Sequence, residues 1–127
     1  MNILIILAIA SGGALGAVSR HLTNILFANA GMGLPWATLT VNIIGSFIMG
    51  LTISYLAHFD NNISQEVKAL ITTGFLGALT TFSTFSLDAL SLMQKGEYIY
   101  AGLYILASVV TCLLSVLGGM IVMRVFA

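Results

Sequence analysis

Hydroxyl and aromatic side chains are concentrated in one segment, GALTTFSTFSLDAL at residues 77–90, of a chain that is otherwise rich in hydrocarbon. Its hydroxyl residues are Thr80, Thr81, Ser83, Thr84 and Ser86. Phe82 and Phe85 lie three residues apart among them, which places both rings on one face of a helix. An aromatic ring is negative on its face and positive at its edge. Two rings presented edge-on among hydroxyl donors would therefore form a weakly cationic slot that suits a passing anion; the alternative is that the rings pack as ordinary core aromatics.

Two further segments repeat polar side chains at helical spacing. In TLTVNIIGS, residues 38–46, Thr38, Asn42 and Gly45 share one helix face. An amide in lipid needs hydrogen-bond partners, so Asn42 either clamps two helices together or offers its amide N–H to a solute. Towards the C-terminus a polar stripe favours a lined path, with a helix–helix contact as the alternative; its members are Tyr104, Ser108, Thr111 and Ser115.

The segment SGGALGAVSR, residues 11–20, combines small residues with a cation. Gly12 and Gly16 form a G-x-x-x-G pair, which lets helix backbones approach closely in lipid. Arg20 follows one turn later on the same face. A charge within a membrane segment is costly and usually faces a partner or a wet cavity. Arg20 therefore either extends to the interface or draws an anion into a vestibule.

The remaining titratable residues argue against an enzyme and against a proton-coupled cation exporter. The acids Asp60, Glu66, Asp88 and Glu97 all fall near the ends of apolar segments or in loops, whereas such an exporter needs a carboxylate at mid-membrane to relay protons. His21 and His58 also fall near segment ends, and no set of nucleophile, base and orienting group is visible. The single Cys112 excludes an internal disulfide and a cysteine metal cluster. A net charge of zero implies no nucleic-acid partner.

The composition indicates the elements that must position these side chains. The chain is 59% hydrophobic and 6% charged, whereas soluble domains carry about 25% charged residues. We therefore expect an all-α integral membrane protein with one domain over residues 1–127. A spanning helix needs about 20 mostly apolar residues, and four segments qualify, at approximately residues 3–27, 36–57, 66–93 and 98–125. Pro35 suits a first helical turn, Asn62 or Ser64 suits an N-cap, and Gly96 suits the position after a helix end.

The third of these segments is expected to break at mid-membrane. TTGFLGALTTF carries Gly74 and Gly77, followed by Thr80 and Thr81, and this combination can interrupt a membrane helix. Broken backbone survives at that depth only where protein buries it or where it lines a cavity. Carbonyl groups freed by such a break can bind a small cation.

The basic residues do not determine the orientation of the chain in the membrane. With four spans, Lys68 and Arg124 lie towards one side, and Arg20 and Lys95 lie towards the other. This equal division gives no positive-inside bias. A chain that inserts both ways can pair head to tail as an antiparallel dimer, and the alternative is a short chain with too few charges to show a bias.

Together these motifs resemble the bacterial fluoride channels, the CrcB or Fluc family. The resemblance covers nearly the whole length, and it is carried by GGALGAVSR, TLTVNIIGS and, most specifically, TTGFLGALTTFSTFS. It implies a four-helix subunit that forms an antiparallel, dual-topology homodimer in the bacterial inner membrane. It also implies passive conduction of fluoride, which lowers the cytoplasmic fluoride concentration. Spacing alone does not indicate fluoride.

The resemblance also assigns roles to residues. Phe82 and Phe85 match the family's pore phenylalanines, and Arg20 matches its first-helix arginine. Gly77 and Thr80 match positions whose backbone carbonyls hold a structural sodium ion at the dimer centre. The expected pore residues are Asn42, Phe82, Phe85, Ser83, Thr84, Tyr104, Ser108 and Thr38. Fluoride is strongly hydrated, so these donors must replace its water shell. Asp88 departs from the glutamate expected at that position, and the shorter side chain puts its reach in doubt.

Two other functions stay open on the sequence. The first is a small dual-topology multidrug or guanidinium exporter, which also uses four short helices. The absence of a central carboxylate in the first span argues against it. The second is a non-conducting membrane subunit that only packs against partners, and the continuous polar stripes argue against that.

Overall fold

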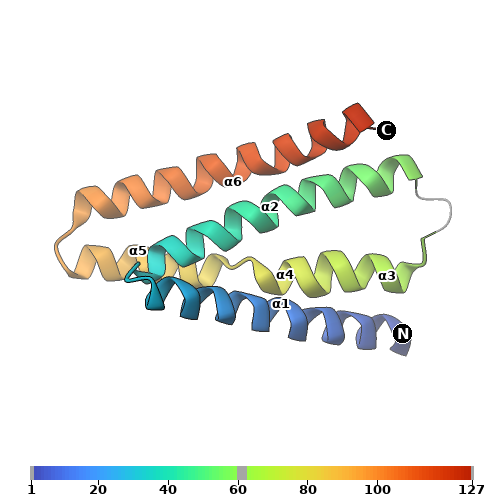
Figure 1. Cartoon of the computed structure of the whole chain (residues 1–127), viewed down its shortest axis with the longest axis horizontal. Coiled ribbons are helices and arrows are strands. Elements are labelled where there is room, and N and C mark those ends of the chain that lie inside the picture. The colour runs from blue at the N-terminus through green and yellow to red at the C-terminus, as the bar shows by residue number, and fades with distance from the viewer. Residues whose placement is uncertain (1, 60–62, 127) are drawn as a thin grey trace.

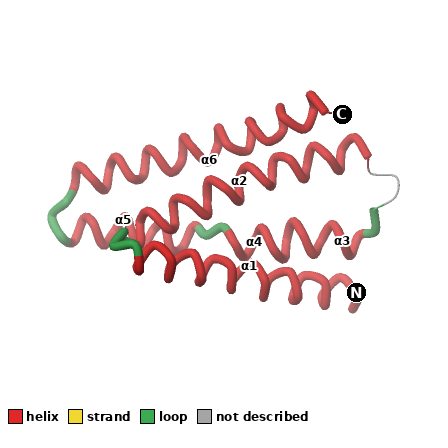
Figure 2. Tube along the Cα trace, viewed as in Figure 1, coloured by secondary structure: helices red, strands yellow, loops and turns green. Residues whose placement is uncertain are grey.

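The computed structural model describes residues 2–59 and 63–126, and these form helices joined by short turns (Figure 1, Figure 2). The first two membrane passages are α1 (Ile3–Asn29) and α2 (Leu34–Phe59). The third consists of α3 (Gln65–Ala69), the π-helix η2 (Leu70–Leu76), α4 (Gly77–Leu79) and α5 (Phe82–Gln94). The fourth is α6 (Tyr98–Phe126). Four passages are long and apolar enough to cross a membrane, which confirms the predicted all-α, multi-pass membrane fold.

Local sequence sets the ends of these helices. Asn2 caps α1 by accepting a hydrogen bond from Leu4 N, and Ser64 caps α3 by accepting one from Val67 N. The alternative cap, Asn62, lies outside the described residues. Gly96 has a φ of +79° directly after the third passage. Glycine adopts that left-handed conformation without steric cost, so the chain turns sharply into α6.

Glycines on α1 allow close backbone contact with the third passage. A methyl group on Gly12 would overlap the carbonyl oxygen of Leu70, and one on Gly16 would overlap that of Phe75. Gly74 is the η2 residue of the same contact, because a Cβ there would lie 3.0 Å from Gly12 Cα. This glycine contact between α1 and η2 is the close packing that small residues permit in lipid.

A second glycine contact joins α2 to α6. A methyl group on Gly50 would overlap the carbonyl oxygen of Val116, and one on Gly119 would overlap that of Phe47. The subunit is thus two closely packed helix pairs, α1 with the third passage and α2 with α6, which lie side by side (Figure 1). Both chain ends lie at the same end of the bundle in this view.

The third passage is interrupted at its middle, as the sequence predicts. Thr80 and Thr81 have extended backbone between α4 and α5, near the centre of the span Gln65–Gln94 (Figure 2). The π-helix η2 before the break was not predicted. Such wide turns are often associated with functional sites, and here the π-helix lies against the glycine face of α1.

Candidate functional site

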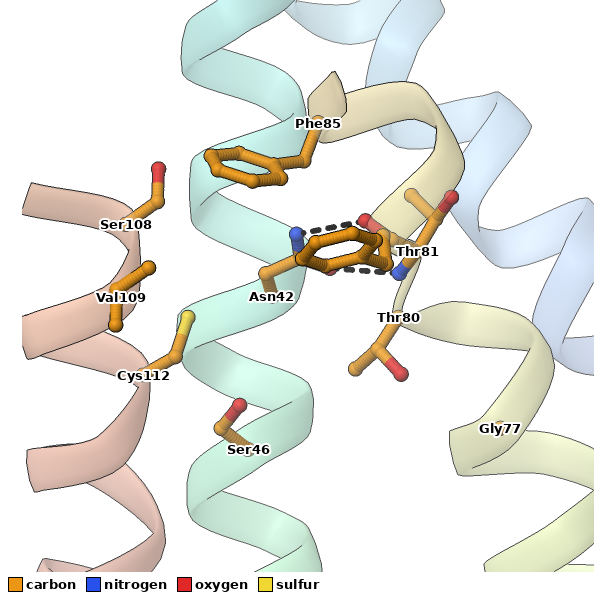
Figure 3. Close-up of a pocket in the computed structure, with 10 residues that line it drawn as sticks. Asn42, Ser46, Gly77, Thr80, Thr81, Phe85, Ser108, Val109 and Cys112 are labelled. Carbon is orange, nitrogen blue, oxygen red and sulfur yellow. Dashed lines mark hydrogen bonds between the residues drawn. The ribbon is translucent and has the colours of Figure 1, made fainter. Parts of the chain in front are cut away.

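Asn42 holds the break in the third passage through two reciprocal hydrogen bonds. Its Nδ2 donates to the carbonyl oxygen of Thr81 at 3.1 Å, and its Oδ1 accepts from Thr81 N at 2.8 Å (Figure 3). The amide therefore replaces helical partners that the interrupted backbone has lost. Its NH₂ group has two hydrogens, so one remains for another acceptor. Asn42 thus forms the interhelical clamp, one of the two roles that the sequence left open, and donation to a solute stays a prediction.

Thr81 starts the second half of the passage by capping α5. Its Oγ1 accepts a hydrogen bond from Thr84 N at 3.2 Å and lies 3.1 Å from the Thr84 hydroxyl and 3.2 Å from that of Ser83. Ser83 and Thr84, which the sequence placed in the pore, therefore gather around this N-cap. Neither lines the pocket described below.

A pocket of about 370 Å³ lies at the break, between α2, the third passage and α6 (Figure 3). It is lined by Asn42, Ser46, Gly77, Thr80, Thr81, Phe82, Phe85, Ser108, Val109 and Cys112. The pocket thus brings together six of the predicted site residues from three separate passages: Asn42, Gly77, Thr80, Phe82, Phe85 and Ser108. None of the side chains that line it carries a formal charge.

Aromatic rings form a continuous row beside the pocket. The ring centroids of Phe82 and Phe85 are 5.3 Å apart with planes at 49°, and those of Phe85 and Tyr104 are 5.5 Å apart at 40°. These tilted arrangements bring ring edges towards neighbouring faces, the geometry that aromatic pairs prefer. Phe85 is 8% exposed and Phe82 is 77% exposed. The two rings therefore differ in their surroundings within one subunit, because protein packs around Phe85 and leaves most of Phe82 exposed.

Tyr104 links this row to a buried carboxylate. Its hydroxyl donates to Asp88 Oδ2 at 3.3 Å, and Asp88 is 6% exposed. Thr38 and Ser108 also lie beside the Tyr104 hydroxyl. The shorter arm of Asp88 thus still reaches Tyr104. Thr38 and Tyr104 do not line the pocket.

Ser108 and Arg20 differ in their relation to the pocket. Ser108 lines the pocket, but its Oγ is buried and lies beside the Tyr104 hydroxyl. Arg20 lies half-buried on α1 and does not line the pocket. No hydrogen bond or ion pair joins its guanidinium group to residues 2–59 or 63–126. Within a single subunit, Arg20 is therefore separate from the pocket.

Two polar residues of the pocket, Ser46 and Cys112, were not among the predicted site residues, and Thr81 was predicted at the break but not as a pocket residue. Ser46 and Cys112 lie four residues after Asn42 and Ser108, so the helical period could have indicated both. Thr111, which was placed in the polar stripe, instead donates its hydroxyl to the Ala107 carbonyl at 2.6 Å. The stripe in the pocket is therefore Ser108 followed by Cys112. The role of Thr81 depends on the clamp with Asn42, which no local pattern indicates.

The break also frees backbone carbonyls. In a continuous helix Thr81 N would donate to the Gly77 carbonyl and Thr84 N to the Thr80 carbonyl. Here Thr81 N donates to Asn42 and Thr84 N donates to Thr81 Oγ1. Gly77 and Thr80 both line the pocket. The site therefore has neutral hydrogen-bond donors that suit an anion. It also has carbonyl oxygens without their helical donors, and these suit a cation.

Comparison with known proteins assigns this architecture to a family. The model of the CrcB-like (camphor resistance, CrcB) family matches residues 7–120. The chain belongs to the CrcB-like family. A member from Hahella chejuensis is 49% identical over 91% of both chains, and one from Magnetococcus marinus is 48% identical over 91% of this chain and 94% of the relative. A third, from Geobacter sulfurreducens, is 46% identical over 94% and 96%. All three relatives are named fluoride-specific ion channel FluC.

The sequence range that matches the CrcB-like family includes every part of the site. The matched range includes α2 from its start, the whole broken passage and α6 as far as Met120. The pocket, its aromatic row and the Asn42 clamp therefore all lie in the region shared with this family.

Proposed function

We propose that this protein is a passive, fluoride-selective channel of the bacterial inner membrane and not an enzyme. The observation that carries the proposal is the pocket at the helix break, which is built from neutral donors at the middle of a membrane span. The names of its relatives supply the identity of the ion.

The pocket has the chemistry that a small anion needs in order to leave water and move on. The free Asn42 N–H, the hydroxyls of Ser46 and Ser108, and the edge of Phe85 can each replace part of a hydration shell. Because no lining side chain is cationic, the ion is not held by a fixed charge. Conduction requires binding of this moderate strength.

Efflux from liposomes that contain the purified full-length protein tests this function. Fluoride should leave down its gradient with no pH gradient imposed, and chloride should be retained. Protein-free liposomes and liposomes with the Phe85→Ile variant provide the controls. Equal loss of both halides would contradict selectivity. Transport that requires a proton gradient, or movement of guanidinium instead of fluoride, would indicate an exporter.

We further propose that the channel is an antiparallel homodimer. Gly77, Phe82 and Ser83 are exposed at the break in a single subunit. Interrupted backbone is not tolerated against lipid, which favours a second copy that covers this surface. A two-fold axis through the break would bring both copies of each residue together. The even division of Lys68 and Arg124 against Arg20 and Lys95 is compatible with insertion in both orientations.

A structural sodium ion at this axis fits the residues that are present. Gly77 and Thr80 would contribute their carbonyl oxygens from each subunit, and the loss of helical donors described above supports their availability. Neutral oxygens suit a hard monovalent cation, and no group of three or more His, Cys, Asp or Glu residues within 2–59 and 63–126 offers another metal site. When bound, the ion would add positive potential beside the anion path. Replacement of sodium by N-methylglucamine during purification and efflux should then reduce fluoride flux, and unchanged flux would contradict the ion.

A further inference from the structure

A second groove, of about 480 Å³, opens between the starts of α2 and α6 and the end of α5. Trp36 and Leu39 line it from α2, Glu97 from the turn before α6, and Tyr100 from the first turn of α6. The turns that precede α2 and α6 lie at the end of the bundle opposite both termini (Figure 1). The groove is distinct from the pocket at the helix break, since the two share no lining residue.

The groove is polar at its rim and apolar along its length. Glu97 directly precedes the span Tyr98–Phe126, and Trp36 is the second residue of the span Pro35–Phe59, so both lie at a membrane surface. Leu103 and Ala107 continue the lining further along α6. From Tyr100 to Ala107 the helix rises about 10 Å towards the membrane centre. The groove therefore has room for the headgroup and the upper acyl chain of one lipid.

The charge that lines the groove is negative. Glu97 is its one charged lining residue, and the Glu97 carboxylate makes no hydrogen bond or ion pair with residues 2–59 or 63–126. Lys95, two residues earlier in the same turn, does not line the groove. Tyr104 does line it and donates to Asp88 Oδ2 at 3.3 Å, which places a second carboxylate one hydrogen bond away. A cation is therefore the ligand whose charge complements this groove.

Two aromatic residues at the rim add to the attraction for a cation. Trp36 is 61% exposed and Tyr100 is 68% exposed, and neither ring packs against another ring among the described residues. The face of an aromatic ring attracts a cation, and that of tryptophan does so most strongly. The indole N–H and the phenol O–H are also hydrogen-bond donors. Tryptophan and tyrosine are common at membrane surfaces, but here a carboxylate lies in the same groove.

We propose that this groove binds a phospholipid with a primary ammonium headgroup, of the phosphatidylethanolamine type. The ammonium group donates to the Glu97 carboxylate and lies against the rings of Trp36 and Tyr100, whose N–H and O–H groups donate to the phosphodiester. The acyl chain follows Leu103 and Ala107. A trimethylammonium headgroup fits less well because it has no N–H for the carboxylate, and an anionic headgroup is repelled by it.

Trp36 is the only tryptophan of the chain, so its fluorescence reports on this groove alone. The full-length protein is reconstituted into vesicles of equal parts phosphatidylethanolamine, phosphatidylcholine and phosphatidylglycerol. In each of three samples a different lipid carries bromine on its acyl chains, which quenches tryptophan on contact. We expect phosphatidylethanolamine to quench with an association constant roughly tenfold above that of phosphatidylglycerol, with phosphatidylcholine in between.

Two pairs of variants test the residues that form the site. Glu97→Gln keeps the size of the side chain and removes its charge, so the preference for phosphatidylethanolamine should disappear. Glu66→Gln removes an exposed carboxylate at the opposite end of the bundle and should leave the preference unchanged (Figure 1). Tyr100→Leu should weaken the preference. Tyr98→Leu should have no effect, because Tyr98 is 70% exposed and does not line the groove.

Equal quenching by phosphatidylethanolamine and either other lipid would overturn the proposal, and so would a preference that survives in Glu97→Gln. Absence of quenching by every brominated lipid would also overturn it, because protein, in this case the second copy, would then cover Trp36. The measurement does not require conduction of fluoride. Failure of the lipid site and failure of the proposed function are therefore distinguished.

Discussion

At the scale of single residues, Asn42 pairs interrupted backbone and also lines the pocket. Its amide nitrogen donates to the C=O of Thr81, and its amide oxygen accepts from the N–H of the same residue. A hydroxyl group has one oxygen for both tasks, whereas the amide has a separate atom for each. The interrupted backbone is thereby paired inside the membrane. The remaining N–H is available at the pocket surface.

Substitutions of Asn42 should separate these two roles. Asn42→Asp keeps an acceptor for Thr81 N but loses both donors and adds a negative charge, so fluoride efflux should be abolished in a protein that still folds. Asn42→Ala leaves the buried Thr81 groups unpaired, which costs about 1–3 kcal/mol, so its thermal stability in detergent should fall. Folded Asn42→Asp with unimpaired efflux at neutral pH would remove this amide from the ion path.

The aromatic row leads to a second prediction at this scale. Phe82→Ile and Phe85→Ile keep apolar bulk but remove the ring edge, whose interactions are worth about 0.5–1.5 kcal/mol. Fluoride efflux should fall roughly tenfold in each, since about 1.4 kcal/mol corresponds to a factor of ten. Phe85→Ile should also lower thermal stability more than Phe82→Ile, because only Phe85 is buried within the subunit.

Leu87→Ile is the matched control for this pair, since Leu87 is exposed on α5 and does not line the pocket. If both phenylalanine variants, tested singly and as folded dimers, conduct at the wild-type rate, the ring-edge account is wrong.

At the scale of elements, the broken passage is positioned by glycine contacts that lie away from the pocket. The α1 glycines fix η2, and η2 leads directly into α4 and the break. A change on α1 should therefore disturb a site to which α1 contributes no lining residue.

Gly12 and Gly13 provide a direct test of this coupling. A methyl group on Gly12 would overlap the Leu70 carbonyl, whereas one on Gly13 meets nothing within 4 Å. Overpacking costs about 1–3 kcal/mol, so Gly12→Ala should lower thermal stability in detergent and reduce fluoride efflux. Gly13→Ala should match the wild type in both. Equal behaviour of the two variants would show that α1 does not hold the third passage at this distance.

The elements were easier to predict from sequence than the contacts between them. Hydropathy and length indicated four spans, and the Gly77–Thr81 segment indicated the break, because these are local properties. The π-helix was not foreseen, because its wide turns match no simple periodicity. The pairing of Asn42 with Thr81 joins residues 39 apart in sequence. Ser83 and Thr84 illustrate the remaining difficulty, since a run of hydroxyls does not reveal which of them cap a helix.

At the scale of the whole molecule, one subunit buries little of its own surface. Among the described residues, Leu76 is the one large side chain that is fully buried, and apolar side chains are exposed on every passage. Lipid can cover most of that surface, but it offers no hydrogen bond to the Gly77 and Thr80 carbonyls that have lost their helical donors. The complete channel is therefore expected to need a second copy.

Orientation should be controllable by charge. Two lysines at Ala30 and Met32, in the turn between α1 and α2, should bias every copy one way, because cytoplasmic loops retain positive charge. Two lysines at Asn61 and Asn62, which lie outside the described residues, should bias copies the other way. Neither variant alone should protect cells from fluoride, and co-expression of both should restore growth. Full protection by one biased variant would indicate that parallel subunits suffice.

The two glycine contacts have a thermal consequence. Close contact between two helix backbones in lipid is stabilised by dispersion and not by release of water, because the surrounding lipid chains are as apolar as the helices. Separation of these helices within the bilayer therefore exposes no apolar surface to water and carries little change in heat capacity. Water-driven cores weaken on cooling, but helix contacts of this kind have no such low-temperature decline, so the fold of the subunit should hold in the cold as long as its membrane stays fluid.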